Sequence, residues 1–247
     1  MQAVRFTAVG ELLVDVVAEG SGHDAHIRLR PAGSAFNAAA AAAAAGAEAT
    51  VVGTVGDDAG GRMLLAELAA RGLNAEVAVA EGATGTFLLA DGEVRVDRGV
   101  GHDVVVPDRL VADAVLVSGY LRPPTIEEAL DRARAQWVAL DAARLRELPR
   151  GGNAVFASEE WLGGRDPEPT ARLLAEGRRL ACVTLGARGA IAVMGDSVER
   201  AHPEHMAADA PGAGDAFAAT LLVALARGDD LAHALSQASR AALDSLA

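Results

Sequence analysis

Short apolar runs alternate with segments of helical character along most of the chain, and this alternation is the main structural signal in the sequence. The apolar runs predict strands at Val4–Val9, Leu12–Val17, Ala49–Thr54, Ala114–Val117, Trp137–Leu140, Ala154–Phe156, Ala181–Leu185 and Ala190–Met194. Helices are expected at Ser34–Ala45, Gly60–Arg71, Pro124–Ala135, Glu168–Gly177, Gly212–Arg227 and Leu231–Leu246. Such a pattern predicts an α/β protein with a mostly parallel sheet covered by helices on both faces. Ligands of such sheets bind beyond the carboxyl ends of the strands.

The segment Ala75–Arg98 breaks the alternation, because it reads as short strands and turns without a helix. Within it, Thr86–Ala90 and Glu93–Val96 are joined at Asp91-Gly92, which predicts a β-hairpin. The hairpin could be a lid over a site or an edge extension of the main sheet, and the sequence does not decide between them. We expect a single domain over residues 1–247, with a short β lid at roughly 12–30 and 75–98.

The composition limits both the core and the location of the protein. Hydrophobic residues make up 51% of the chain and aromatic residues 3%, so the core must be built from Ala, Val and Leu. No apolar run is long enough to span a membrane, and Glu11 and Asp15 interrupt the N-terminal run, which is therefore read as a strand rather than a signal peptide. The single Cys182 cannot form an internal disulfide and is expected to be buried. We expect a cytoplasmic protein that does not bind membranes.

The charged residues exclude several functions. A net charge of −12 argues against a nucleic-acid partner, because phosphate backbones require a basic surface. All 22 basic residues counted as Lys or Arg are Arg. The absence of Lys excludes a lysine-containing P-loop, Schiff-base chemistry and the protein-kinase arrangement. Any phosphoryl chemistry must therefore use backbone amides, arginine and a metal ion.

The string Asp209-Ala-Pro-Gly-Ala-Gly-Asp215 leads into an apolar helix and is the most informative motif. Free N–H groups and the helix dipole favour an anion at such a helix start. Gly212 and Gly214 allow a phosphate to approach the backbone, and Asp215 beside it could take a proton from an attacking hydroxyl. An Asp in a first helical turn is also common for dipole reasons alone, so the specificity lies in the full string.

That string, Asp209-x-x-Gly212-Ala213-Gly214-Asp215 followed by Ala216-Phe217, closely resembles the second signature of the ribokinase-like (PfkB) carbohydrate kinases. The resemblance implies a three-layer α/β/α sandwich with a small β lid. It also implies transfer of the ATP γ-phosphoryl group to an alcohol. By resemblance, Asp215 is the catalytic base, Gly212, Ala213 and Gly214 form the anion hole, and Asp209 lies near a monovalent cation.

The N-terminal half resembles the acceptor side of this family. Gly10-Glu-Leu-Leu-Val-Asp15 is similar to the first strand, whose terminal Asp contacts substrate hydroxyls. Ala32-Gly33-Ser34-Ala35-Phe36-Asn37 resembles the Gly-Gly-x-x-x-Asn element, with Ala in place of the first Gly. The implied acceptor-binding residues are Asp15, Gly33, Ser34 and Asn37. Ser34 is also expected to cap the alanine-rich helix, and in the run Gly53–Gly60 either Asp57 or Asp58 is expected to cap the next helix.

The C-terminal half resembles the nucleotide side. Val183-Thr-Leu-Gly-Ala-Arg-Gly-Ala190 matches the strand-turn-strand before the ATP site, which implies nucleotide contacts from Thr184, Gly186, Arg188 and Gly189. In isolation, Gly-x-x-Gly predicts only a hairpin turn. The family's Asn-x-x-Glu element is altered in Phe156-Ala-Ser-Glu-Glu-Trp161. There Ser158 takes the place of the Asn, and Glu160 (or Glu159) is expected to organise Mg²⁺.

We therefore expect an ATP- and Mg²⁺-dependent kinase acting on a small sugar or sugar acid. A nucleoside kinase on the same fold is the alternative, but the plausible aromatic residues near the site, Phe36, Phe87 and Tyr120, are few for stacking on a base. A catalytically silent ligand-binding relative is the second alternative. The family includes homodimers paired through their lids. It also normally continues past the last helix with a segment that helps to enclose adenine and the monovalent cation, so that cation is the weakest of these expectations.

Overall fold

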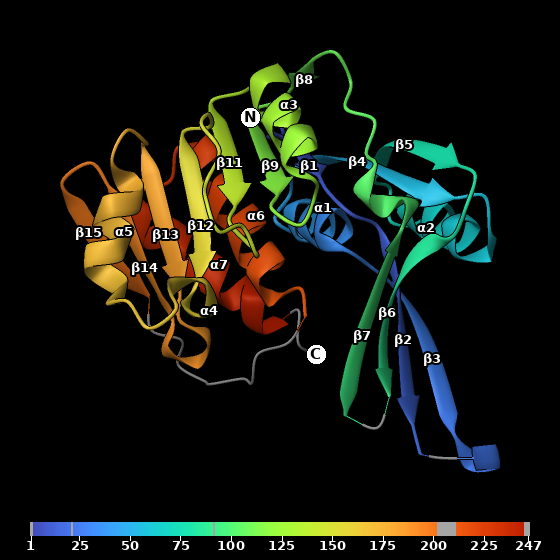
Figure 1. Ribbon diagram of the computed structural model, residues 1–247. Helices are drawn as coiled ribbons and strands as arrows, with labels where there is room; N and C mark the ends of the chain where they lie inside the picture. The colour runs from blue at the N-terminus through green and yellow to red at the C-terminus, as the bar shows by residue number, and fades with distance from the viewer. Residues whose placement is uncertain (1, 21, 91, 202–210, 245–247) are drawn as a thin grey trace.

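The computed structural model describes residues 2–20, 22–90, 92–201 and 211–244. Nine strands form the main sheet, in the order β15-β14-β13-β12-β11-β9-β1-β4-β5 (Figure 1). From one edge to the other, their bounds are Ser197–Ala201, Ala190–Met194, Leu180–Thr184, Ala154–Ser158, Trp137–Asp141, Ala114–Ser118, Arg5–Val9, Glu48–Gly56 and Asn74–Ala80. All neighbours from β13 to β5 pair in parallel, and only β14 and β15 are antiparallel.

Alternating side chains of the central strands point to opposite faces, and both faces are buried. On β9, Ala114 and Leu116 belong to one hydrophobic core, whereas Val115 and Val117 belong to another. Strands buried on both faces read as continuous apolar runs rather than as alternating patterns. This explains why the apolar runs of the sequence predicted these strands well.

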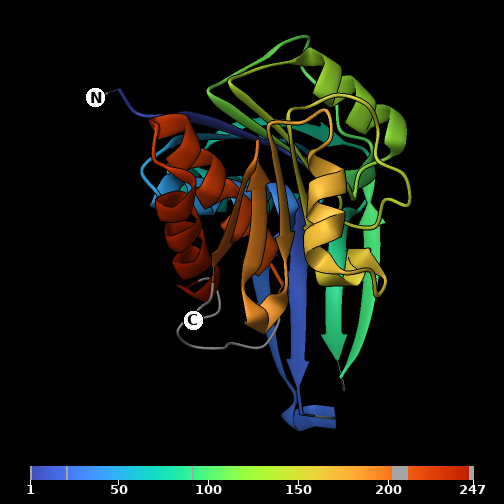
Figure 2. The same ribbon diagram turned by 90° about the vertical axis from the view of Figure 1, so that its left-hand side faces the viewer.

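Helices cover both faces of the main sheet, so the body has three layers (Figure 2). The helices are α1 Ser34–Ala44, α2 Ala59–Ala70, α3 Pro123–Arg132, α4 Glu159–Leu162, α5 Pro167–Ala175, α6 Ala213–Arg227 and α7 Leu231–Asp244. The core of one face includes residues of α1, α2, α6 and α7, and residues of α3, α4 and α5 pack on the other face. Alanine dominates the facing surfaces of α1 and α6, so these two helices pack closely side by side.

A second, four-stranded sheet projects from this body in the order β3-β2-β6-β7 (Figure 1), and we call it the small sheet. Its strands are β2 Leu13–Glu19, β3 His26–Ala32, β6 Thr84–Ala90 and β7 Glu93–Gly99. The predicted hairpin is therefore β6–β7 and lies in a separate sheet, not at the edge of the main one. Residues 75–80 were wrongly included in this unit, because β5 pairs in parallel with β4 over its whole length.

Asp58 ties the small sheet to the body. Its carboxylate caps α2 by accepting from Gly61 N (2.8 Å), and it also accepts from Thr84 N (2.8 Å) and Thr84 Oγ1 (2.5 Å) at the start of β6. The Thr84 hydroxyl in turn accepts from Gly56 N at 3.0 Å. The hydrogen bonds from Thr84 and Gly61 lower the pKa of Asp58 to about 2. Asp58 is thus the helix cap that the sequence assigned to Asp57 or Asp58.

Two further expectations can be compared with the fold. Cys182 is fully buried in β13, where burial raises its pKa, as expected of a structural cysteine. The helix predicted to reach Ala135 ends at Arg132, because Ala133–Arg134 form a short strand, β10, paired with β8 (Leu110–Val111). Within the described residues, none of the helices combines the length and apolar character needed to cross a membrane.

Candidate active site

The start of α6 carries the glycine-rich motif. Gly212 is the N-cap residue, with φ of 92° and ψ of −12°, a left-handed conformation that favours glycine. A Cβ on Gly212 would lie 2.9 Å from Asn37 Nδ2, so the space also requires glycine. A Cβ on Gly214 would meet no atom within 4 Å, so the backbone there faces open space. The N–H groups of the first turn have no acceptor within the helix and are available to an anion from that side.

Asp215 lies in this first turn and is hydrogen-bonded to Asn37 of α1. Asn37 Nδ2 donates to Asp215 Oδ2 at 3.0 Å, across the close contact between the two helices. The bond fixes one carboxylate oxygen and orients the other. Two residues predicted from separate motifs, one as base and one as acceptor-binding residue, are therefore direct neighbours.

The environment of Asp215 favours its protonated form. Burial raises its pKa well above the usual value, and the negative charge of Asp141 raises it further, while the Asn37 hydrogen bond opposes the shift. Asp141 is the last residue of β11, and burial raises its own pKa to about 6 against a hydrogen bond from Ala143 N (3.2 Å). A carboxyl group with a raised pKa is suited to accept a proton near neutral pH.

A buried carboxylate, Glu11, links the body to the small sheet. It follows β1, has 4% of its surface exposed, and pairs through Oε1 with Arg98 Nη1 of β7 at 3.2 Å. Burial raises the pKa of Glu11 to about 7, although the Arg98 charge opposes this. The Arg98 guanidinium also stacks on Tyr120, 5.1 Å from the ring centroid. Arg98 is thus a small-sheet residue held at the edge of the same site.

The predicted acceptor residues Gly33 and Ser34 lie at the start of α1 with roles that differ from those expected. Gly33 is the N-cap, with φ of 105°, and a Cβ there would lie 2.3 Å from the Glu11 carbonyl oxygen. Glycine is thus already required by the backbone. The prediction that Ser34 caps α1 is wrong, because Ser34 is already helical and its Oγ is buried with no hydrogen-bond partner among the described residues.

Asp15 lies on β2 of the small sheet, partly buried, where burial raises its pKa against the opposing charge of Arg30. Asp15 is opposite Phe87 on β6, and Leu13, two residues away, is opposite Gly85, which pairs with Arg98. Side chains two residues apart share a face. Asp15, Phe87 and Arg98 therefore project from the same face of the small sheet.

The predicted nucleotide residues gather at the ends of β12 and β13. Ser158 and Thr184 are register partners, and Thr184 Oγ1 donates to Ala157 O at 3.4 Å. Ser158 caps α4 by accepting from Trp161 N at 3.2 Å. Trp161 fills a structural position, since its Nε1 donates to Leu145 O at 2.7 Å.

The glycine turn follows immediately. Gly186–Arg188 form a short 3-10 helix closed by the hydrogen bond from Gly189 N to Gly186 O (3.0 Å), with Gly186 at φ of 54° and Gly189 at 93°. Arg188 forms an ion pair with Glu159, which joins this turn to α4. Glu160 is exposed beside them. The residues predicted for nucleotide contact thus lie together, and all belong to exposed or partly buried turns.

The metal candidates can be placed only in part. Asp209 lies outside the described residues. Within the described residues, no group of three or more His, Cys, Asp or Glu side chains could hold a metal ion. Glu160 remains as a single exposed carboxylate. Mg²⁺ typically binds through one or two carboxylates together with phosphates and water, so this donor set suits a metal that arrives with a nucleotide.

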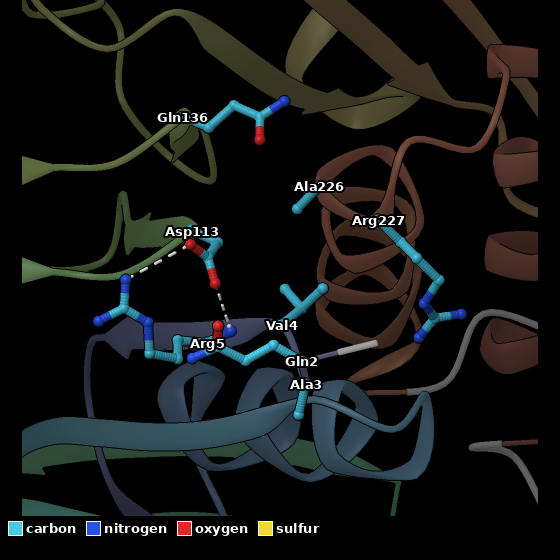
Figure 3. A pocket seen from close by; sticks show the side chains of 8 residues that line it. All are labelled: Gln2, Ala3, Val4, Arg5, Asp113, Gln136, Ala226 and Arg227. Carbon is cyan, nitrogen blue, oxygen red and sulfur yellow. Dashed lines mark hydrogen bonds and ion pairs between the residues drawn. The ribbon is translucent and has the colours of Figure 1, made fainter.

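Two hollows in the described part of the chain bracket the main sheet. A small cavity of about 10 Å³ lies beneath Asp215 and is also lined by Asp141, Ser34 and Ser118. A larger hollow of about 300 Å³ lies at the opposite end, around Arg5, Asp113, Gln136 and Arg227 (Figure 3). There Asp113 accepts from Arg5, and Arg227 donates to Ala45 O, so these charged groups already serve the fold.

Sequence reasoning missed Asp141 and Arg98 and left Glu11 without a role. Asp141 carried a usable signal, because it ends the apolar run Trp137–Leu140, and ligands of parallel sheets bind at that end. Glu11 carried a weaker one as the acid that follows the first strand. Arg98 carried none, since its proximity to Glu11 depends on how the small sheet meets the body.

Comparisons with known proteins agree on one family. The model of the pfkB family carbohydrate kinases matches residues 5–105 and 157–243. A comparison with the curated proteins gives no match.

Solved structures with a similar fold include two kinases that differ in acceptor class. The ribokinase from Thermotoga maritima has a TM-score of 0.81 at 18% identity and covers 97% of this chain and 91% of its own. The adenosine kinase from Sinorhizobium meliloti has a TM-score of 0.81 at 23% identity, covering 98% and 93%.

The Arabidopsis thaliana ribokinase, solved with ribose and ATP, has a TM-score of 0.79 at 21% identity, covering 98% of this chain and 92% of its own.

Proposed function

The chain belongs to the pfkB family of carbohydrate kinases and has the ribokinase-like fold, and we propose that it transfers the γ-phosphoryl group of ATP to an alcohol group of a sugar or sugar acid. The observation that carries this proposal is the pairing of Asp215 with Asn37 at the start of α6. It combines a carboxylate able to accept a proton with a helix N-terminus able to hold a phosphate.

Asp215 acts as the general base. It takes the proton of the acceptor hydroxyl as the oxygen attacks the γ-phosphorus, and ADP leaves from the opposite side. The backbone N–H groups from Gly212 to Asp215 stabilise the negative charge of the transferring group. Open space over Gly214 gives the phosphate access to them.

ATP is held between this helix start and the turns at the ends of β12 and β13. Thr184, Gly186, Arg188 and Gly189 contact the nucleotide, and Ser158 positions α4 beside it. Bound Mg²⁺ supplies charge neutralisation on the phosphates. Glu160 is the exposed carboxylate of the described residues that is placed to help hold it.

The small sheet serves as a lid over the acceptor. Asp15 accepts hydrogen bonds from acceptor hydroxyls, as a carboxylate can from two hydroxyls at once, and Asn37 contacts the acceptor next to the base. Phe36 cannot stack on a nucleobase, because it is 4% exposed in α1 and its ring is covered by Arg71 at 5.2 Å. This reduces the aromatic surface of the site and supports a sugar over a nucleoside.

A nucleoside kinase is the second candidate, and Phe87 is the observation that favours it. Phe87 shares a face of the small sheet with Asp15, its register partner, so it could stack on a base whose ribose binds Asp15. A catalytically silent relative is disfavoured by Asp215, since a protein without catalysis does not need a carboxylate held in this geometry.

The test is ADP formation from Mg-ATP with a panel of sugars, sugar acids and nucleosides, comparing the wild-type protein with Asp215→Asn. Loss of the base should lower kcat by about 10²–10⁴-fold. ATP affinity and thermal stability should change little, because Asn resembles the protonated carboxyl group that burial favours.

Asp113→Asn, at the opposite end of the sheet, is the matched control and should keep its turnover. Turnover that survives in Asp215→Asn would overturn the assignment of the base. A folded wild-type protein that consumes no ATP with any acceptor would favour the silent relative.

A further inference from the structure

The cavity beneath Asp215 places a second carboxylate next to the base. Asp141 and Asp215 both line it, from the end of β11 and the start of α6, and Ser34 of α1 and Ser118 of β9 line it too. Its other walls are apolar, and its volume of about 10 Å³ is near the lower limit of roughly 10–15 Å³ for one water molecule.

The polar groups of this cavity converge without fully satisfying one another. Ser34 is 9% exposed, and its Oγ has no hydrogen-bond partner among the described residues. Ser118 Oγ accepts from Tyr120 N at 3.2 Å and keeps its own proton to donate. A buried water normally makes two to four hydrogen bonds, and Ser34, Asp141 and Asp215 together offer three.

We propose that Asp141 is a positioning residue of the base, which with Ser34 holds one water against Asp215, so that the base shares its proton with a second carboxylate. This rests on the proposed function of Asp215. The exchange is balanced, because Asp215 gives its proton to the water oxygen while the water gives another proton to Asp141. No other reactant is needed, and the base is returned to its ionised form.

The charged groups around Asp215 come from every element packed against it. Asp141 of β11 is the largest charge effect on Asp215 after burial, and Glu11, beyond β1, is a smaller one. Arg98 of β7 neutralises part of the Glu11 charge through its ion pair. Tyr120 lies near all three carboxylates and near Arg144. Of these groups, Asp141 alone combines a negative charge with a shared cavity wall.

Asp141→Asn is the test variant, and it has two readouts. Removing a like charge makes Asp215 easier to ionise, so the acidic limb of the kcat profile should move to lower pH by about one unit. KM for the acceptor should change little, since Asp141 is not placed to touch it. The second readout is a ¹³C NMR titration of the Asp215 carboxyl, assigned by its loss in Asp215→Asn, which needs neither acceptor nor turnover.

Three companion variants separate charge from structure. Asp141→Glu keeps the charge and should return the limb toward its wild-type position. Glu11→Gln removes the weaker charge and should move the limb by less than Asp141→Asn does. Ser34→Ala keeps both carboxylates but removes one partner of the water, and should move the Asp215 titration slightly upward, because its ionised form loses a donor.

An unchanged Asp215 titration in folded Asp141→Asn would overturn the proposal. If that variant does not fold, an unchanged titration in Ser34→Ala would overturn it instead. Failure of the proposed function is distinguishable, because a wild-type protein without turnover would still show, or fail to show, the shift of the NMR titration.

Discussion

The two halves of the site are built in opposite ways. On the acceptor side, Asp215, Asn37, Asp141 and Glu11 come from four separate elements, and burial shifts the pKa of all three carboxyl groups upward. On the nucleotide side, Ser158 and Gly186–Gly189 belong to turns whose hydrogen bonds are mostly local. The first half depends on how helices and strands pack, and the second on the conformation of short segments.

This difference indicates how each half responds to change. A buried polar group that loses its partner costs free energy because it cannot find water instead. An exposed turn residue can be solvated when its partner is removed. We therefore expect substitutions on the acceptor side to change kcat strongly and those on the nucleotide side to change mainly the KM for ATP.

Gly212→Ala is expected to have the largest effect after loss of the base itself. It forces a side chain into a left-handed conformation, which costs about 1–2 kcal/mol, and its Cβ would meet Asn37 Nδ2 at 2.9 Å. Displacement of Asn37 should lower kcat by about 10²-fold and reduce Tm by several degrees. Steady-state kinetics and thermal unfolding measure both.

Gly214→Ala is the matched comparison, because its Cβ meets no atom within 4 Å. Its Tm should not fall, since alanine is the better helix former. A similar Tm loss in both glycine variants would contradict the packing difference described for this turn.

Asn37→Ala is expected to have the next largest effect. It removes the hydrogen bond to Asp215 Oδ2, which favours the ionised base. The pKa of Asp215 should therefore rise, so the acidic limb of the kcat profile should move to higher pH and kcat at pH 7 should fall about tenfold. A pH–rate profile measures this, and a limb that moved to lower pH would contradict it.

Arg188→Ala should have the smallest effect. Its ion pair with Glu159 is exposed, and such pairs contribute about 0–1 kcal/mol. Tm should stay within a degree or two, while KM for ATP should rise a few-fold and kcat should hold. Arg172→Ala, which breaks an exposed pair with Glu168 in α5, controls for general loss of charge. A large loss of kcat in Arg188→Ala alone would remove the contrast between the two halves.

The fold was largely predictable from sequence, because most of its strands are buried on both faces. Runs such as Ala114–Val117 and Ala190–Met194 reappear as strands with almost the same bounds. The errors lie where local pattern is weak. Asn74–Ala80 resembles a lid strand because it is an exposed edge, and only its pairing with β4 assigns it to the main sheet.

The candidate site was predictable where it is continuous in sequence and unpredictable where packing creates it. The helix start at Gly212–Asp215 and the turn at Gly186–Gly189 are local, and the motifs located them. Ser34 was misassigned because the left-handed conformation of Gly33 starts α1 one residue earlier than a serine cap would. The pairing of Glu11 with Arg98, far apart in sequence, depends on tertiary structure alone.

The bonds around Asp58 also constrain how the small sheet can move. Because Thr84 is fixed through both its amide and its hydroxyl, β6 behaves mechanically like a beam clamped at its root, and bending should be concentrated beyond that residue. The clamp requires an ionised Asp58, whose pKa is lowered to about 2. Its contribution to stability is therefore present above the ordinary pKa of an aspartate and lost only as the pH falls toward 2. The stiffness of the small sheet at its base should thus be the same at every pH where the base, Asp215, changes its own charge.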